Sequence, residues 1–469
     1  MKSLFVAGTA LLIIHSAFAA ESSSEAKKFW PQWRGPSATG VGLEADPPLE
    51  WSETKNIKWK VQTPGAGDST PIVWGDKIFI LTAVPTGKTV EQKLEPAGAE
   101  RSPTQLAQQP PPPGGERRPP RRGGPQGGGR GMGKPDEVYQ FTVVCIDRKS
   151  GKTLWQKVAR ETVPHEGHQQ NNTYASSSAV TDGQLVFAHF GSEGLHCYDM
   201  DGNLKWSKDF GKMQTRMGFG EGASPTLYGD KVIVYWDDET DNDFITALDK
   251  RSGKEIWRTK RNEATGWSTP LVVEYNGKPQ VIVNASEKVR SYNLSDGKEI
   301  WSCAGQTKNS IPSPVADKET VYITSGFQGA ALFAIQLGRT GDLTGTDAIR
   351  WTHNKSTPYV PSPLLVDDLI YFVANNRAQL SCCETKKGET QFEAERLEGL
   401  NEIYASPVAA KDRVYVLGRD GTCVVLKKGP KFEIIATNKL DAKTDASIAL
   451  VGKELFIHGR ENLYCISER

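Results

Sequence analysis

The chain has 469 residues, of which 24% are charged, and its formal net charge is only +1 at pH 7. Because the positive and negative charges nearly cancel, the chain is not expected to bind nucleic acid or an anionic membrane surface through an overall basic charge. The seven cysteines are an odd number, so they cannot all pair within the chain.

The N-terminus has the pattern of a secretory signal. Lys2 gives a positive start, residues 4–14 form an apolar core, and Ala17-Phe18-Ala19 is a small-x-small cleavage site. No later run reaches the roughly 18 apolar residues of a membrane span, and no cysteine lies near the cut to accept a lipid. We therefore expect residues 1–19 to be a signal peptide and the mature protein to be periplasmic or secreted, without a transmembrane segment.

A repeated unit organises the rest of the chain, and Phe244–Trp257 shows it most completely. An apolar run ends at Asp249, Gly253 follows, and a second apolar run ends at Trp257. This predicts a strand, a tight turn and a strand, because Asp can accept from the turn's own N–H groups and Gly supplies a positive φ. A second copy has Asp147, Gly151 and Trp155. The closing aromatics of successive units are Trp155, Trp206, Trp257, Trp301, Trp351, Phe392 and Phe432.

Each unit also begins in a similar way, with a Ser/Thr-Pro-apolar segment or a close variant of it. The eight starts are Ser69-Thr70-Pro71, Ser177-Ser178-Ala179, Ala223-Ser224-Pro225, Ser268-Thr269-Pro270, Pro312-Ser313-Pro314, Pro361-Ser362-Pro363, Ala405-Ser406-Pro407 and Ala446-Ser447-Ile448.

The count of starts and ends predicts the architecture. Eight starts face seven closing aromatics, and the missing aromatic is Trp59, which lies in a short strand-like segment, residues 56–60, near the N-terminus. Four strands in roughly 40–50 residues are typical of a propeller blade. We therefore predict an all-β fold in residues 56–469: an eight-bladed β-propeller of four-stranded antiparallel blades, with the last blade closed by an N-terminal strand. Such closure leaves no open sheet edge at the end of the ring.

Two segments fall outside this repeat. Residues 20–55 are rich in aromatic and turn residues, and we expect them to form an extension that packs on the propeller. Residues 85–137, approximately, interrupt the first blade with a Pro-, Gly- and Arg-rich sequence that cannot bury a core and is expected to be disordered. Because residues 101–134 carry seven basic side chains and one acidic one, this insertion is either a solvated loop or a tether for an acidic partner or cell-wall polymer.

The motif at Ala247, Asp249, Gly253, Lys254 and Trp257 resembles the tryptophan-docking motif of pyrroloquinoline-quinone-like propeller repeats. The resemblance extends over nearly the whole mature chain. It implies one of two relationships: to quinoprotein dehydrogenases, which bind the quinone with Ca²⁺ on the propeller axis and oxidise alcohols or sugars, or to the non-enzymatic scaffold lipoprotein of the outer-membrane β-barrel assembly machinery. The chain is most similar to exported bacterial members that belong to neither class.

The adjacent Cys382 and Cys383 are the first chemical candidates, because the resemblance implies that such a pair could form a vicinal disulfide against the quinone. The repeat offers a second interpretation. Cys382 occupies the third-strand position at which another unit has Ala247, as do three other cysteines. A small buried thiol suits a core position, and its strand neighbour points to the other face. The pairing of Cys382 with Cys383 stays open.

Candidate metal ligands are present but are poorly spaced. The acidic run Asp237–Asp243 offers oxygen ligands for Ca²⁺, yet it lacks an EF-hand spacing and is better explained as a solvated turn. His165 and His168 lack a second ligand pair. No nucleophile elbow, P-loop or dinucleotide fingerprint occurs. We therefore assign no catalytic residues and no metal ligands.

Topology predicts a binding face. In a four-stranded blade the loops between second and third strands emerge on the same rim as the crossings between blades, and functional loops gather where a rigid scaffold presents them. The candidate residues on that rim are His165, His168, Asn171, Arg216, Glu221, Trp267, Tyr359, Arg377, Tyr404, Arg419 and Arg460.

We expect an exported, monomeric, non-enzymatic binding or scaffolding propeller that uses this rim for a ligand or for a protein, peptide or carbohydrate partner, without a cofactor. The alternative is an alcohol or sugar dehydrogenase that depends on pyrroloquinoline quinone and Ca²⁺. A third possibility is a propeller that binds or processes carbohydrate through the rim aromatics.

Overall fold

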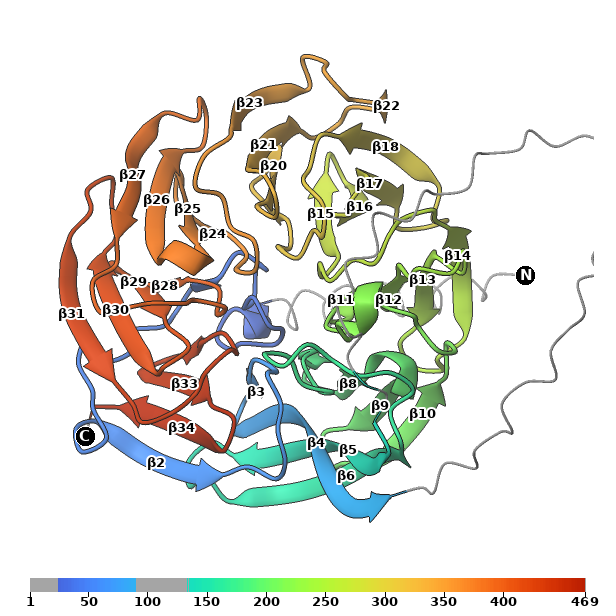
Figure 1. Cartoon of the computed structure of the whole chain (residues 1–469), viewed down its shortest axis with the longest axis vertical. Helices are drawn as coiled ribbons and strands as arrows, with labels where there is room; N and C mark the ends of the chain where they lie inside the picture. Colours follow the sequence, from blue (N-terminus) through green and yellow to red (C-terminus); the bar gives the residue numbers. More distant parts are fainter. Residues whose placement is uncertain (1–23, 90–132, 134, 469) are drawn as a thin grey trace, which may run out of the picture.

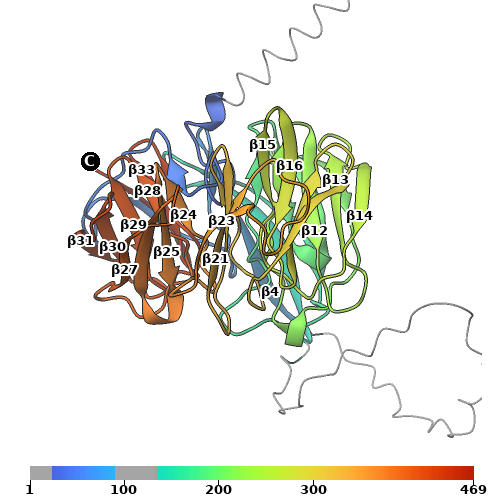
Figure 2. The ribbon, with the colours of Figure 1, turned by 90° about the horizontal axis from the view of Figure 1, so that it is seen from above.

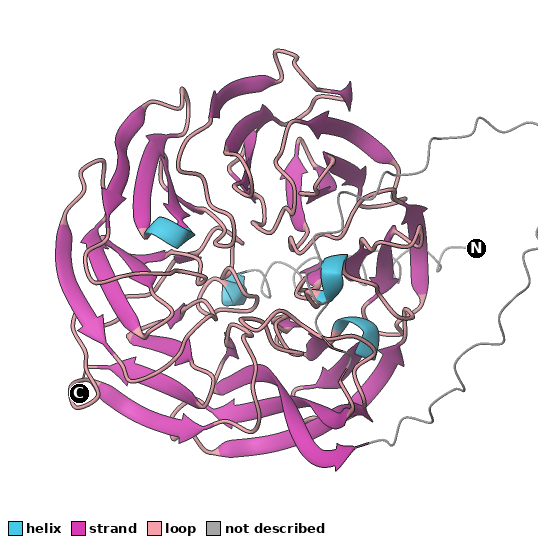
Figure 3. Cartoon of the chain, viewed as in Figure 1, coloured by secondary structure: helices cyan, strands magenta, loops and turns pink. Residues whose placement is uncertain are grey.

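A computed structural model describes residues 24–89, 133 and 135–468. Eight separate antiparallel sheets stand around one axis, and the chain contains almost no helix (Figures 1 and 3). The predicted eight-bladed, all-β propeller is therefore confirmed. The predicted signal peptide, residues 1–19, lies outside the described residues.

The first four blades each contain four strands in the order of the chain, from the axis outward (Figure 1). Their bounds are as follows: β3 (Ile72–Trp74), β4 (Lys77–Thr89), β5 (Glu137–Asp147) and β6 (Thr153–Thr162); β7 (Val180–Thr181), β8 (Leu185–His189), β9 (Leu195–Asp199) and β10 (Leu204–Lys208); β11 (Thr226–Tyr228), β12 (Lys231–Trp236), β13 (Phe244–Asp249) and β14 (Glu255–Lys260); β15 (Leu271–Tyr275), β16 (Lys278–Val283), β17 (Lys288–Asn293) and β18 (Glu299–Ala304).

The last four blades continue the ring, and two short strands, β22 (Gly341–Asp342) and β1 (Val41–Gly42), add a parallel fifth strand to blades 4 and 7. Their bounds are as follows: β19 (Val315–Ala316), β20 (Thr320–Ser325), β21 (Ala331–Gln336) and β23 (Ile349–His353); β24 (Leu364–Val366), β25 (Leu369–Ala374), β26 (Gln379–Glu384) and β27 (Thr390–Arg396); β28 (Val408–Ala410), β29 (Arg413–Leu417), β30 (Thr422–Lys427) and β31 (Ile434–Lys439); β32 (Ala449–Val451), β33 (Glu454–His458), β34 (Asn462–Ser467) and β2 (Ile57–Gln62).

The ring closes in blade 8, as predicted. Strand β2, from the N-terminal part of the chain, pairs antiparallel with β34, and Trp59 stands opposite Cys465. The same register joins Trp155 to Cys145 and Trp257 to Ala247, so a small residue faces the aromatic in each case.

Tryptophan side chains fasten neighbouring blades to each other. Each indole N–H donates to a backbone carbonyl in the turn between the third and fourth strands of the next blade: Trp59 to Arg148 at 3.0 Å, Trp155 to Met200 at 3.1 Å, Trp206 to Lys250 at 3.0 Å, Trp257 to Leu294 at 2.9 Å and Trp351 to Thr385 at 2.7 Å. Trp301 differs, because it donates to Gln280 of its own blade at 3.1 Å.

The glycine of each of these turns packs directly against the tryptophan ring of the preceding blade. Gly253 has φ +67°, and a Cβ built there would lie 2.6 Å from the ring of Trp206. The Oδ1 atom of Asp249 accepts from the backbone N–H of Ser252 at 2.8 Å and holds the turn in shape. The Asp and Gly of the repeat therefore form a platform for the tryptophan of the preceding blade.

Blade 7 corrects one part of the predicted repeat. Ala436, not Phe432, occupies the aromatic register opposite Val425, and Phe432 lies outside β31. Trp51 of the N-terminal segment stacks on Tyr415, with ring centroids 6.2 Å apart. Trp155 packs in a similar way against Phe79, the residue of its own blade that is equivalent to Tyr415. A tryptophan from a distant segment thus replaces the one that blade 7 lacks.

A closed ring of hydrogen bonds surrounds the axis. At the start of each blade, one backbone N–H donates to the hydroxyl oxygen of the corresponding residue in the next blade, over 2.8–3.2 Å. We call these eight residues the hydroxyl ring. In order they are Thr70, Ser178, Ser224, Thr269, Ser313, Ser362, Ser406 and Ser447, whose N–H donates back to Thr70.

The N-terminal segment crosses the axis on the face that carries the tight turns (Figure 2, dark blue). Trp30 pairs with Val73 of blade 1, whereas the buried Arg34 donates to the carbonyls of Pro363 at 2.7 Å and Pro407 at 3.0 Å, at the starts of blades 6 and 7. The segment thus links blade 1 to blades 6 and 7 and covers the turn face of the axial channel.

The interruption of blade 1 begins later than predicted. Strand β4 continues through residues 85–89, paired with β5, and β5 begins at Glu137. Residues 90–132 and 134, which include most of the predicted disordered insertion, lie outside the described residues.

The acidic run of blade 3 is only partly the solvated turn that the sequence suggested, because residues 239–242 form a mostly exposed bend whereas the two ends of the run are buried. Asp237 is fully buried and forms a bidentate ion pair with Arg261, at 2.6 and 2.8 Å. Asp243 is also buried, and its Oδ1 atom accepts from the N–H of Asp238 at 2.8 Å. The buried ends of the run therefore connect β12 to the start of the next crossing.

All seven cysteines are buried and unpaired. Cys382 packs between blades 6 and 7, and Cys383 packs between blades 5 and 6. Their side chains therefore serve two different hydrophobic interfaces.

We predict that Gly253→Ala lowers the melting temperature more than Gly277→Ala. Both glycines have a positive φ, which strains an alanine by about 1–3 kcal/mol. Only at Gly253 would the added Cβ also collide with Trp206, since a Cβ at Gly277 meets nothing within 4 Å. Thermal unfolding followed by circular dichroism measures the melting temperatures of both variants. Equal decreases would mean that Trp206 is not closely packed against Gly253.

We also predict that Ser406→Ala lowers the free energy of unfolding, measured by two-state chemical denaturation, by about 1–3 kcal/mol, because the buried N–H of Ser362 loses its acceptor. Ser406→Thr is the matched control, since it keeps the hydroxyl and threonine already stands at positions 70 and 269. An alanine variant as stable as the threonine variant would contradict a stabilising role for the ring.

Candidate functional site

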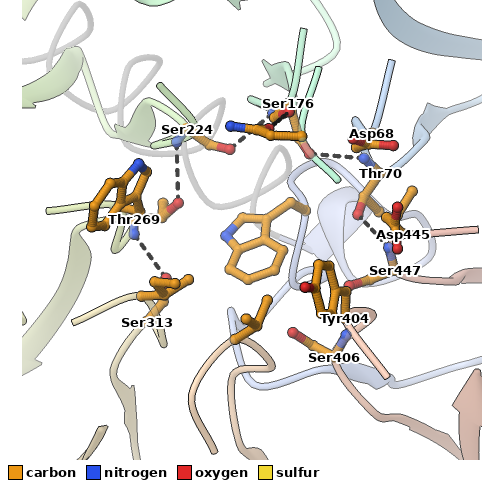
Figure 4. A pocket seen from close by; sticks show the side chains of 18 of the residues that line it. Asp68, Thr70, Ser176, Ser224, Thr269, Ser313, Tyr404, Ser406, Asp445 and Ser447 are labelled. Atoms are coloured by element: carbon orange, nitrogen blue, oxygen red, sulfur yellow. Dashed lines mark hydrogen bonds between the residues drawn. The ribbon is translucent and has the colours of Figure 1, made fainter. Parts of the chain in front are cut away.

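An axial funnel of about 450 Å³ opens on the face that carries the blade crossings, which we call the crossing face. Its lower wall contains seven members of the hydroxyl ring, and Trp33 of the N-terminal segment also lines it. Figure 4 shows Ser224, Thr269 and Ser313 joined in succession around this funnel, and Thr70 joined to Ser447.

A second ring of side chains forms the upper wall, and its positions are set by those of the hydroxyl ring. Two residues before each member of the hydroxyl ring, the chain places one residue per blade against the funnel. We call these eight positions the wall ring. In blade order they are Asp68, Ser176, Gly222, Trp267, Ile311, Val360, Tyr404 and Asp445.

The aromatic side chains of the funnel are held in place from behind. The indole N–H of Trp267 donates to the carbonyl of Gly220 at 2.7 Å. The guanidinium of Arg419 lies 4.2 Å from the ring centroid of Tyr404, and the ring of Tyr359 lies 4.9 Å from that of Phe327. The funnel therefore presents fixed aromatic surfaces.

Two arginines engage the funnel carboxylates. Asp445 accepts from Arg419 at 2.6 and 3.1 Å and from Arg460 at 3.2 Å. Arg460 also approaches Asp68, with its Nε atom 3.8 Å from Oδ1. Burial raises the pKa of Asp68 to about 7, the Asp445 carboxylate adds to this rise, and Arg460 opposes it. Asp68 therefore titrates near neutral pH rather than in the usual acidic range of a carboxyl.

The structure gathers only part of the predicted rim around the funnel. Asn171, Trp267, Tyr359 and Tyr404 line it. Behind the wall, Arg419 and Arg460 bind Asp445, and Arg460 also donates to the carbonyl of Asn171 at 3.0 Å.

The other predicted rim residues lie elsewhere. His165 and Glu221 line a separate cavity of about 30 Å³, and the ring of His168 packs against Tyr174 with centroids 4.4 Å apart. Arg216 donates to Asn309 at 3.3 Å, and Arg377 is exposed on the 3-10 turn η4 (Asn375–Arg377). None of these five lines the funnel.

The small cavity is an acidic structural cluster. Burial raises the pKa of Glu221 to about 8, and the neighbouring Glu166 and Glu193 contribute to the rise. Glu221 accepts from the N–H of Ser192 at 2.8 Å. Among the described residues, no three His, Cys, Asp or Glu side chains come together as metal ligands.

The sequence contained a signal for the residues that we missed. A hydroxyl residue stands at the same place in all eight blade starts, and the wall ring lies two residues earlier. In particular, Asp68 and Asp445 hold equivalent positions in adjacent blades. Trp33 had no such repeat signal, because it comes from the crossing N-terminal segment.

Comparison with solved structures shows the propeller fold. A europium-containing methanol dehydrogenase matches at TM-score 0.62 and 9% identity, over 96% of this chain and 100% of that one. The quinohemoprotein alcohol dehydrogenase from Comamonas testosteroni matches at TM-score 0.60 and 10% identity, over 96% and 84%. BamB from Moraxella catarrhalis matches at TM-score 0.49 and 16% identity, over 70% and 89%. No curated protein sequence matches the chain.

Within the described residues, no helix is long and apolar enough to cross a membrane. The family model described as outer membrane protein assembly factor BamB matches residues 140–394, from β5 to β27, which is more than half of the chain. The chain is a pyrroloquinoline-quinone-like β-propeller protein and belongs to the family described as outer membrane protein assembly factor BamB.

Proposed function

We propose that this chain is a non-enzymatic binding propeller that holds its partner at the axial funnel of the crossing face. The observation that carries the proposal is the wall ring, because each of the eight blades contributes one residue to a single cavity. A volume of about 450 Å³ lies within the ~300–1,000 Å³ of pockets that hold a small molecule. Loops from several blades surround this cavity and offer further contacts.

The cost of keeping Asp68 in the wall supports a binding role. A carboxyl that is buried next to a second carboxylate destabilises the folded protein when it ionises. Titratable groups with such perturbed pKa values concentrate at functional sites. The cavity and the perturbed carboxyl coincide at this funnel.

Action outside the cytoplasm is the second part of the proposal. The signal pattern in residues 1–19 supports it, and so does the description of the matching family, which refers to outer membrane protein assembly. By analogy with that description, a protein partner would bind across the crossing face.

The alternative, a quinone-dependent dehydrogenase, has less support in the residues of the funnel. Asp68 and Asp445 are the carboxylates that a Ca²⁺ ion could use there, but Asp445 already accepts three hydrogen bonds from Arg419 and Arg460. Cys382 and Cys383 lie within blade interfaces and not at the funnel. This donor set does not fit the quinone with its Ca²⁺, and we derive no chemistry through it.

Site-specific crosslinking tests the binding face. A photo-reactive diazirine amino acid at Met217, which is 58% exposed and two residues from the funnel residue Phe219, is expected to give a defined adduct in cells that express the full chain. The same group at Leu204, which is 56% exposed on the outer strand β10, is the matched control. Gel shift and mass spectrometry identify the adduct.

The adduct from position 217 should disappear when Trp267→Ala or Tyr404→Ala is added, because these side chains form the funnel wall. Equal adducts from positions 217 and 204, or no adduct from position 217, would argue against a partner at the crossing face. A quinone chromophore retained after dialysis against pyrroloquinoline quinone and Ca²⁺ would instead favour the dehydrogenase.

Asp68→Asn should stabilise the protein in a pH-dependent way. Because the pKa of Asp68 is raised in the folded state, its contribution to stability is complete below about pH 4 and is lost as pH rises to about 7. The variant should gain about 1–3 kcal/mol over the wild type at pH 8 and little at pH 4, and Arg460 keeps its bond to Asp445. Melting temperatures across this range measure the gain; a pH-independent difference would contradict the assignment.

A further inference from the structure

We propose that the occupant of the axial funnel is a neutral saccharide unit, an inference that rests on the proposed binding function. It names the chemical class of the ligand, which neither the family match nor the structural relatives specify. The argument follows from the order of side chains in the wall ring, the free donors below it, its charge balance and its closed floor.

The wall ring is divided into an apolar half and a polar half. Blades 4 to 7 contribute Trp267, Ile311, Val360 and Tyr404, whereas blades 8, 1 and 2 contribute Asp445, Asp68 and Ser176. A pyranose ring has the same division, since its C–H groups form an apolar face and its hydroxyls form a polar edge. Aromatic side chains with fixed rings offer the flat apolar surface that such a face needs.

The hydroxyl ring adds hydrogen-bond donors at the base of the funnel. Each of its oxygens accepts an N–H from the preceding blade, which leaves the hydroxyl proton to be donated elsewhere. Within residues 24–89, 133 and 135–468, the seven of these hydroxyls that line the funnel donate no hydrogen bond to another protein group. Together with the acceptor oxygens of Asp68, they suit a ligand whose groups both accept and donate. Hydroxyl groups have this property.

The charges around the funnel are balanced. Arg419 contacts Glu402 and Asp445, and Arg460 contacts Asp445 and Asp68. Two arginines therefore face three acids, and the pKa of one of these acids, Asp68, is raised. The arginine and carboxylate charges beside the funnel are thus paired with each other, which favours a neutral ligand over an anion or a cation.

The floor of the funnel is closed. Trp33 lines it from the N-terminal segment, and the neighbouring Arg34 fixes that segment to blades 6 and 7. A chain cannot pass through, so the ligand is a free mono- or disaccharide or the end of a longer glycan. An extended peptide could not be threaded along the axis.

Titration of the full chain with maltose, cellobiose, lactose and N,N′-diacetylchitobiose tests the inference, followed by a neutral glycan array. We expect saturable quenching of tryptophan fluorescence, because Trp33 and Trp267 line the funnel. Trp267→Ala and Tyr404→Ala should each weaken binding at least tenfold. Tyr404→Phe, which keeps the ring, should weaken it less than threefold. Glucosamine and glucuronate test the charge argument and should bind more weakly than glucose.

Tyr228→Ala is the matched control, because Tyr228 lies at the end of β11 and donates to Glu274 on the propeller surface. Circular dichroism melts establish that each variant is folded. If either alanine variant does not fold, the inference is tested with Tyr404→Phe and Ser176→Ala, again by the quenching of tryptophan fluorescence on addition of sugar. Ser176→Ala should weaken binding severalfold.

Several results would overturn the saccharide inference: no neutral glycan binds, charged sugars bind more tightly, or the funnel variants bind as the wild type does. If the array is empty while the Met217 adduct still depends on Tyr404, only the saccharide inference fails. If the adduct is also lost, the proposed binding function fails with it.

Discussion

The fold depends on the hydrogen bonds that join the blades around the axis. The innermost strands are short, and β7 and β19 have only two residues each. A strand of this length satisfies few backbone groups through its own sheet, and a buried N–H without a partner is costly. The hydroxyl of the next blade supplies the acceptor, and the bond from Ser447 back to Thr70 completes the ring. Eight separate sheets are thus joined around the axis by one continuous ring of hydrogen bonds, which we call the inner seam.

The same seam determines what the molecule can bind. Since the hydroxyl residue is fixed in each blade, the residue two positions earlier stands at a fixed height in the funnel. Its side chain takes no part in the hydrogen bonds between blades. It can therefore vary widely in size, from the glycine at position 222 to the tryptophan at position 267. The hydroxyl ring therefore sets the geometry, and the wall ring sets the chemistry. Substitutions in the wall ring can change the ligand without changing the fold.

The periodic part of this design could be predicted from the sequence, and the non-periodic part could not. Trp59 was recognised as the closing residue because it was the missing member of a series. Trp51 was not recognised, because it fills the place of a blade-7 tryptophan from a segment outside the repeat. Asp237 seemed solvated because its partner, Arg261, comes from another segment and only the folded chain brings them together. Likewise, the rim prediction located Trp267 and Tyr404. Their polar counterparts Asp68 and Asp445 were missed, because only the structure shows that the residue two positions before each blade start faces the funnel.

The path of the N-terminal segment has a consequence for the time course of folding. Residues 30–62 contribute the floor of the funnel, the docking tryptophan of blade 7 and the outer strand of blade 8, whose partner β34 ends at Ser467. Contacts between the two ends of a long chain raise its contact order and slow its folding. The ring cannot close before the last residues of β34 have left the ribosome. Until then β2 has no partner strand, so closure of the ring is a late step in folding.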